Sequence, residues 1–93
     1  MAFDAEKNFN RLCIDCHGSG GLGDGSETQA FDLQTPNFTV SDFWNNTDEQ
    51  QMILAIKDGK GNDMPDFGES LTYEQILALI YHIERSFKPN YKE

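Results

Sequence analysis

The clearest pattern of apolar and polar positions lies near the C-terminal end of the chain. Thr72 is followed three residues later by Gln75, the capping-box arrangement that begins many helices, and Leu71 stands where it can pack on Ile76. The apolar positions after this cap recur at helical spacing and form one stripe, which consists of Ile76, Leu77, Leu79, Ile80, Ile83 and Phe87. Because proline cannot continue a helix, Pro89 ends the pattern. We therefore predict an amphipathic helix between Thr72 and Pro89.

Two weaker patterns predict helices earlier in the chain. Over about residues 2–14 the apolar positions have helical spacing, and they are Ala5, Phe9, Leu12 and Cys13. A further helix is predicted with Thr47 as its N-cap, Gln50 completing a capping box, and Gly59 at its end. Its apolar face consists of Met52, Ile53 and Ile56. No segment alternates as a half-buried strand does, so the predicted fold class is all-α.

The segment between the first two predicted helices, about residues 18–46, is crowded with Gly, Asn, Asp, Ser and Thr. An irregular stretch of this length is unusual inside a compact domain. The 93 residues allow one domain, predicted to span 1–93, and a domain of this size needs more than its own side chains to hold it together. We therefore expect the polar segment to wrap around a large apolar group at the centre.

The composition narrows the possible partners. The chain has 16 acidic and 7 basic residues, a net charge of −9, and its lysines and arginines stand singly, so no nucleic-acid partner is expected. The acid excess favours either solubility or attraction to a positively charged partner. No leader peptide opens the chain, and no apolar run reaches the ~20 residues of a membrane span. We expect no membrane span, and either a removed export signal or a domain of a longer chain.

The central group is indicated by Cys13-Ile14-Asp15-Cys16-His17. Two cysteines three positions apart at the end of a helix share one face, and this spacing suits thioether bonds to the two vinyl groups of a porphyrin. A histidine directly after the second cysteine can reach the iron, and C-x-x-C-H is the pattern of c-type haem attachment. We predict one haem c, bound covalently through Cys13 and Cys16, with His17 as an iron ligand.

Two other interpretations of the cysteines are weaker. A redox-active dithiol of the thioredoxin type belongs beside a βαβ unit, and no strand is predicted here. A structural zinc ion needs four ligands, and only His82 is available to join Cys13, Cys16 and His17.

The candidates for the sixth iron ligand are Met1, Met52, Met64 and His82. Met64 is favoured because Pro65 biases it toward an extended conformation in a loop, from which its thioether can ligate haem iron. Met52 lies on an apolar helix face, where methionine usually fills space, and Met1 is terminal. His82, inside the last predicted helix, stays open as the alternative ligand.

With these motifs in order, the chain resembles the class I cytochromes c, in their small bacterial monohaem branch, over essentially its whole length. The resemblance is carried by the haem motif, by Met64-Pro65, and by the segments around them: Phe9, Gly21-Leu22-Gly23-Asp24-Gly25, Pro36-Asn37-Phe38, Phe43-Trp44, Phe67 and residues 79–83. It departs from the family at His82, where an aromatic residue is common, so we expect the helix crossing either to be supported by Tyr81 or to be hydrogen-bonded differently. The lysine ring of the mitochondrial members is also absent.

The resemblance implies the cytochrome c fold, three main helices around one haem, with His17 and Met64 bound to iron in both oxidation states. It further implies a hydrogen bond from the second nitrogen of His17 to a loop carbonyl, while Trp44 either donates to a haem propionate or simply packs. The implied function is single-electron transfer by a soluble, monomeric periplasmic shuttle that is not an enzyme, whose redox partners present a basic docking surface to acids including Asp15, Asp63 and Asp66. A haem domain of a larger redox enzyme or membrane complex is the alternative, followed by an open-iron ligand sensor or peroxidase-like protein.

Overall fold

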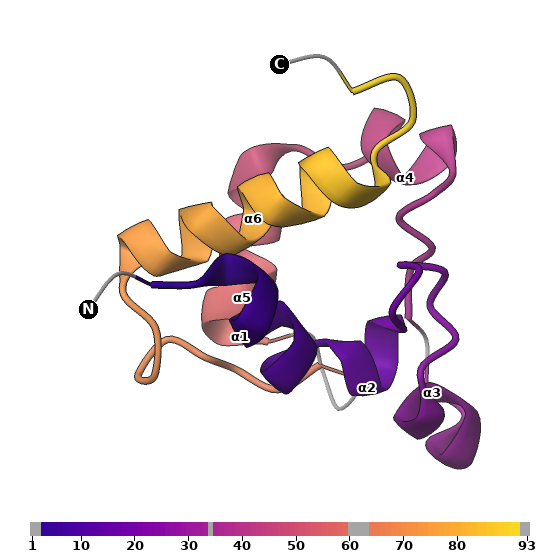
Figure 1. The fold of residues 1–93 in the computed structure, drawn as a ribbon, viewed down its shortest axis with the longest axis horizontal. Coiled ribbons are helices and arrows are strands. Elements are labelled where there is room, and N and C mark those ends of the chain that lie inside the picture. The colour runs from indigo at the N-terminus through magenta and orange to yellow at the C-terminus, as the bar shows by residue number, and fades with distance from the viewer. Residues whose placement is uncertain (1–2, 34, 60–63, 92–93) are drawn as a thin grey trace.

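The computed structural model describes residues 3–33, 35–59 and 64–91 (Figure 1). The regular elements of the described residues are helices, which confirms the predicted all-α class. The helices are α1 (Ala5–Leu12), α2 (Ile14–His17), α3 (Ser26–Phe31), α4 (Ser41–Asn45), α5 (Glu49–Asp58) and α6 (Tyr73–Phe87).

Helix α6 forms where the sequence predicts it. The Thr72 hydroxyl accepts a hydrogen bond from the backbone N–H of Gln75 at 3.2 Å, and the Gln75 side chain accepts one from the N–H of Thr72 at 2.9 Å. Leu71 and Ile76 are both buried in the core, with Leu79, Ile80 and Ile83 following on the same stripe. The capping box and the apolar stripe together determine this helix.

Helix α5 begins one residue later than predicted. Its N-cap is Asp48, whose carboxylate accepts from the N–H of Gln51 at 2.8 Å, while the Gln51 side chain accepts from the N–H of Asp48 at 2.9 Å. The capping box of Thr47 and Gln50 is therefore wrong. The two registers match the same motif, and a carboxylate at the N-terminus of a helix is additionally favoured by the helix dipole.

The corrected cap gives a testable result. Asp48→Ala should lower the free energy of unfolding of the haem-loaded protein by about 1 kcal/mol, because the N–H of Gln51 loses its acceptor and the capping box is broken. Thr47→Ala is the matched control and should lower the free energy of unfolding by much less. Denaturant unfolding followed by circular dichroism measures both values. A larger loss of stability in the Thr47 variant would instead support Thr47 as the N-cap of the helix.

The first predicted helix is shorter than expected and is divided. Asp4 is the N-cap of α1, with its carboxylate accepting from the N–H of Lys7 at 3.0 Å, and α1 ends at Leu12. A separate turn, α2, then carries the second half of the haem motif, and the backbone N–H of His17 donates to the carbonyl of Cys13 at 3.0 Å. The continuous helix over residues 2–14 is therefore wrong, although Ala2 lies outside the described residues.

The polar middle segment contains two short helices that the sequence did not predict. Neither α3 nor α4 buries any of its residues, and neither has a side-chain N-cap. Without buried positions there is no apolar periodicity, and without a cap there is no start signal, so both helices lacked the usual sequence patterns.

The core lies where α6 packs on α1 and α5; in Figure 1, α6 crosses in front of α5, and α1 lies below it. Phe9 of α1 is 1% exposed, and its ring lies 5.3 Å from the ring of His82 and 5.6 Å from that of Phe87. His82 thus packs on the first helix in the place of an aromatic residue. Tyr81 is 47% exposed and faces Arg85, so the expectation that Tyr81 supports the crossing is wrong.

Candidate haem-binding site

A cavity of about 1080 Å³ lies between the helices and the middle segment. This volume is at the upper end of the ~300–1,000 Å³ typical of sites for small ligands and cofactors. All four side chains predicted to hold a haem line this one cavity: Cys13, Cys16, His17 and Met64. Its other walls are largely apolar and include Met52, Ile56, Phe67, Leu79 and Ile83. The structure therefore brings together residues that are up to 51 positions apart in the sequence.

The haem motif is held in place by the segment that follows it. The carbonyl of Cys16 accepts from the N–H of Gly25 at 3.0 Å and from the hydroxyl of Thr28 at 2.7 Å. Gly25 has to be glycine because a Cβ there would overlap the backbone of Asp15 and Cys16. These contacts fasten α3 against α2 and fix the position of Cys16.

The two cysteines are not joined by a disulfide, and each lies in an environment that favours the neutral thiol. Burial, followed by the nearby Cys16, raises the pKa of the Cys13 thiol to about 11, and burial followed by the charge of Glu27 raises the pKa of Cys16 above its usual 9.0. A redox-active dithiol needs the opposite shift, toward the thiolate. Neutral thiols on one cavity wall fit thioether attachment instead.

The metal-binding alternative has little support in the described part of the chain. No group of three or more His, Cys, Asp or Glu side chains gathers there to hold a metal ion. His82, the fourth ligand that zinc would require, packs against Phe9 and does not line the cavity. The same placement removes His82 as a candidate for the sixth iron ligand.

His17 has the properties of a nitrogen ligand. Its side chain is only 8% exposed, and burial lowers the pKa of the imidazole to about 4, so the ring is neutral at pH 7 and carries a free lone pair. Its Nδ1 is buried with no hydrogen-bond partner among the residues that the structure describes, so the expected bond to a loop carbonyl is absent there. The ring instead stacks on Phe38, with the ring centroids 4.7 Å apart and the planes at 19°.

Met64 lines the cavity, and its backbone lies close to the end of α5. Gly59 ends the helix with φ +78°, and a Cβ there would lie 2.6 Å from the carbonyl oxygen of Met64. The chain is tied back to α5 by the N–H of Phe67, which donates to the carbonyl of Ile56 at 2.9 Å. Met64 is half-buried against the core, whereas residues 60–63 lie outside the described part.

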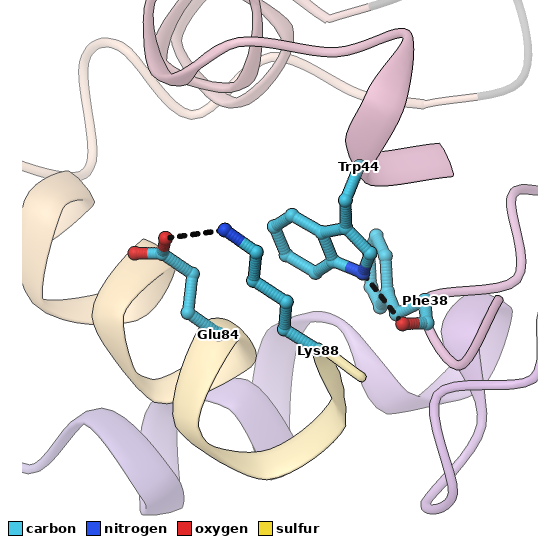
Figure 2. Close-up of polar contacts among 4 residues, drawn as sticks. All are labelled: Phe38, Trp44, Glu84 and Lys88. Atoms are coloured by element: carbon cyan, nitrogen blue, oxygen red, sulfur yellow. Dashed lines mark hydrogen bonds and ion pairs between the residues drawn. The ribbon is translucent and has the colours of Figure 1, made fainter. Parts of the chain in front are cut away.

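Trp44 is engaged within the protein. Its indole N–H donates to the backbone carbonyl of Phe38 at 2.8 Å, so of the two alternatives for Trp44 the structure favours packing within the protein over a bond to a propionate (Figure 2). The ammonium of Lys88 lies 5.3 Å from the centre of the indole ring and 4.0 Å from the carboxylate of Glu84. No sequence pattern marks Phe38 as part of the site, because its contact with His17 is made only by the folded chain.

Comparisons with known proteins agree with this geometry. The family described as cytochrome C oxidase, cbb3-type, subunit III matches residues 2–83. Among curated proteins, the cbb3-type cytochrome c oxidase subunit FixP of Bradyrhizobium diazoefficiens is 29% identical over 82 residues, which cover 88% of this chain and 26% of FixP. The chain therefore spans about a quarter of the length of this relative.

Solved structures share the same fold. The KustC0563 c-type cytochrome superposes with a TM-score of 0.77 at 26% identity, covering 92% of this chain and all of that one. A point mutant of that cytochrome, in which a tyrosine is replaced by phenylalanine, gives the same TM-score and coverage at 29% identity.

The fold and the site define a small c-type cytochrome domain with one covalently attached haem c. The chain belongs to the family of cbb3-type cytochrome c oxidase subunit III. Its function is electron transfer through this haem. The family match and the shared fold confirm the resemblance to the cytochromes c. Within the described residues no helix is long and apolar enough to cross a membrane.

Proposed function

We propose that the chain is a single-domain one-electron relay, spanning residues 1–93, in which Cys13 and Cys16 carry the haem and His17 and Met64 ligate its iron. The observation that carries this proposal is that these four side chains line one apolar cavity. A haem bound there supplies a ferric/ferrous couple, and a thioether ligand favours the ferrous form. Because His17 and Met64 would both hold the iron of a bound haem, no position would be left there for a substrate, so we propose no enzymatic activity.

The charge distribution favours a basic partner. Between Leu12 and Ile56 the sequence has no lysine or arginine, and its acidic residues are Asp15, Asp24, Glu27, Asp32, Asp42, Asp48 and Glu49. This stretch includes the haem motif, and the carboxylate of Glu27 lies 3.8 Å from the sulfur of Cys16. We propose that the protein is a monomer, and that the acidic residues of this stretch dock on a basic surface of a redox protein. Asp15 and Asp66 are exposed as this requires, and Asp63 lies outside the described residues.

Electron-transfer rates with small charged oxidants test the docking proposal. With the cationic tris(phenanthroline)cobalt(III) ion the rate should fall as salt is added, whereas with the anionic ferricyanide ion it should rise, because salt screens charges over about 10 Å at 0.1 M. Glu27→Gln should slow the reaction with the cation. Glu74→Gln is the matched control, because Glu74 lies on α6, outside the stretch without lysine or arginine, and its removal should change this rate less. A cation rate that does not respond to salt, or rises with it, would exclude electrostatic steering.

A second candidate function is an electron-entry domain of a larger oxidase or membrane complex. The specific observation that favours it is the match to a family of oxidase subunits and to FixP, a chain about four times as long as the matched part. In both cases we propose that the haem faces the periplasm.

Tagging the gene at its own locus and purifying its product in mild detergent distinguishes the free shuttle from the domain of a larger complex. A haem-stained band that migrates alone in the soluble fraction supports the shuttle, and a band that co-purifies with oxidase subunits supports the domain.

A further inference from the structure

The imidazole of His17 is covered on one face by an aromatic ring. The planes of His17 and Phe38 lie within 19° of each other at a centroid distance of 4.7 Å, and both side chains are buried. We propose that Phe38 is a positioning residue that fixes the rotation of the His17 ring, and that Trp44 in turn fixes Phe38. The proposal rests on the proposed role of His17 as an iron ligand.

No polar contact within the described residues sets the rotation of the imidazole. The buried Nδ1 has no hydrogen-bond partner among them, so the stacked ring is the contact that resists rotation of His17. Phe38 is itself braced from two sides. The ring of Phe43 meets it edge-on, with the ring centroids 5.0 Å apart and the planes at 71°. The ring of Phe87 stacks near it, with the centroids 6.1 Å apart. With an exposed fraction of 4%, Phe38 has little room to turn.

The backbone of Phe38 is held at both of its polar groups. Its N–H donates to the carbonyl of Gly21 at 2.7 Å, and its carbonyl accepts from the indole of Trp44 at 2.8 Å. Gly21 has φ +70°, and a Cβ there would lie 2.6 Å from the ring of Phe87. The missing side chain at Gly21 therefore lets Phe87 approach the residue that accepts the hydrogen bond from Phe38.

Trp44 connects this arrangement to the end of α6, as Figure 2 shows. Lys88 lies over the indole and contacts Glu84 at 4.0 Å, but both charged side chains are partly exposed, so we expect this ion pair to contribute little. The cation over the ring is a similarly weak contact at such an exposed site. The hydrogen bond to Phe38 is therefore the main way in which Trp44 acts.

The rotation of an iron-bound imidazole has a direct spectroscopic signature. The π orbital of the ring overlaps one direction of the porphyrin more than the other, and the ring plane selects that direction. In the ferric protein this choice sets the order and spread of the paramagnetically shifted haem methyl resonances in the proton NMR spectrum. A purely structural contribution to stability does not change this pattern.

The experiment compares haem-loaded variants in the ferric state. Phe38→Leu should change the order or spread of the haem methyl resonances, and Trp44→Phe, which keeps an aromatic ring but removes the donor, should shift them in the same direction by less. Ile76→Val is the matched control. Ile76 is 2% exposed in the same core but does not line the cavity, so the loss of one methylene should lower stability while leaving the methyl pattern as in the wild type.

Each outcome of this experiment has one meaning. A wild-type pattern in Phe38→Leu, or an equal change in Ile76→Val, would overturn the positioning role. Should Phe38→Leu fail to assemble with haem, Trp44→Phe carries the test, and an unchanged pattern there overturns the proposal. If the wild-type ferric spectrum lacks the strongly shifted ring protons of an iron-bound histidine, the proposed function itself fails, and the positioning role fails with it.

Discussion

The haem-free protein is expected to be largely unfolded. The cavity of about 1080 Å³ is walled by Met52, Ile56, Leu79 and Ile83, which are also members of the buried core of α5 and α6. A porphyrin covers several hundred Å² of such apolar surface, and at ~25 cal/mol per Å² this burial contributes on the order of 10 kcal/mol. Since a whole domain is stable by only about 5–15 kcal/mol, its loss removes most of the stability.

The double variant Cys13→Ala, Cys16→Ala, purified without haem, tests this expectation. Its far-ultraviolet circular dichroism should show little helix, and its thermal melt should lack a cooperative transition. Adding free haem is the control, because recovery of helix attributes the loss to the missing group rather than to the substituted cysteines. A haem-free protein that melts cooperatively near the temperature of the wild type would contradict the prediction.

Met64→Ala is expected to convert a closed iron site into one open to small ligands. The ferric protein should lose the near-infrared sulfur-to-iron charge-transfer band and bind added imidazole. Its reduction potential should fall by on the order of 0.1 V, within the ~0.8 V range that axial ligands control, because the thioether no longer favours the ferrous form.

Met52→Leu provides the matched control for this experiment. Met52 lines the same cavity and is 7% exposed, and leucine nearly conserves its volume. We expect the charge-transfer band to survive in this variant. A band that disappears in Met52→Leu and persists in Met64→Ala would transfer the ligand role to Met52. A wild-type protein without the band would instead favour the open-iron sensor.

The sequence predicted the parts of the site that depend on neighbouring residues. The haem motif occupies five consecutive positions, Met64 is marked by the proline after it, and α6 combines a capping box with a stripe of buried positions. Each of these signals is local and can be read without knowing the fold. The register of α5 was off by one because overlapping capping boxes begin at Thr47 and Asp48, and sequence alone does not weigh them.

The parts that were missed depend on the folded chain. Helices α3 and α4 bury none of their residues, so no periodic pattern marks them. The stacking of Phe38 on His17 joins positions 21 residues apart, and the hydrogen bond from Trp44 uses a backbone carbonyl that no side-chain pattern encodes. His82 was set apart as a departure from the family, yet packing against Phe9 gives it an aromatic role.

The division of the first helix at Cys13 bears on how the protein is made. The turn α2 has four residues and buries only His17, whereas isolated helices shorter than ~12–15 residues are marginal in water. In a newly made chain this turn is therefore expected to be unformed, which leaves both thiols accessible to haem. Bond formation then precedes folding. Once made, the linkage keeps the cofactor on the polypeptide through every later unfolding, so reassembly is intramolecular and independent of any external supply of haem.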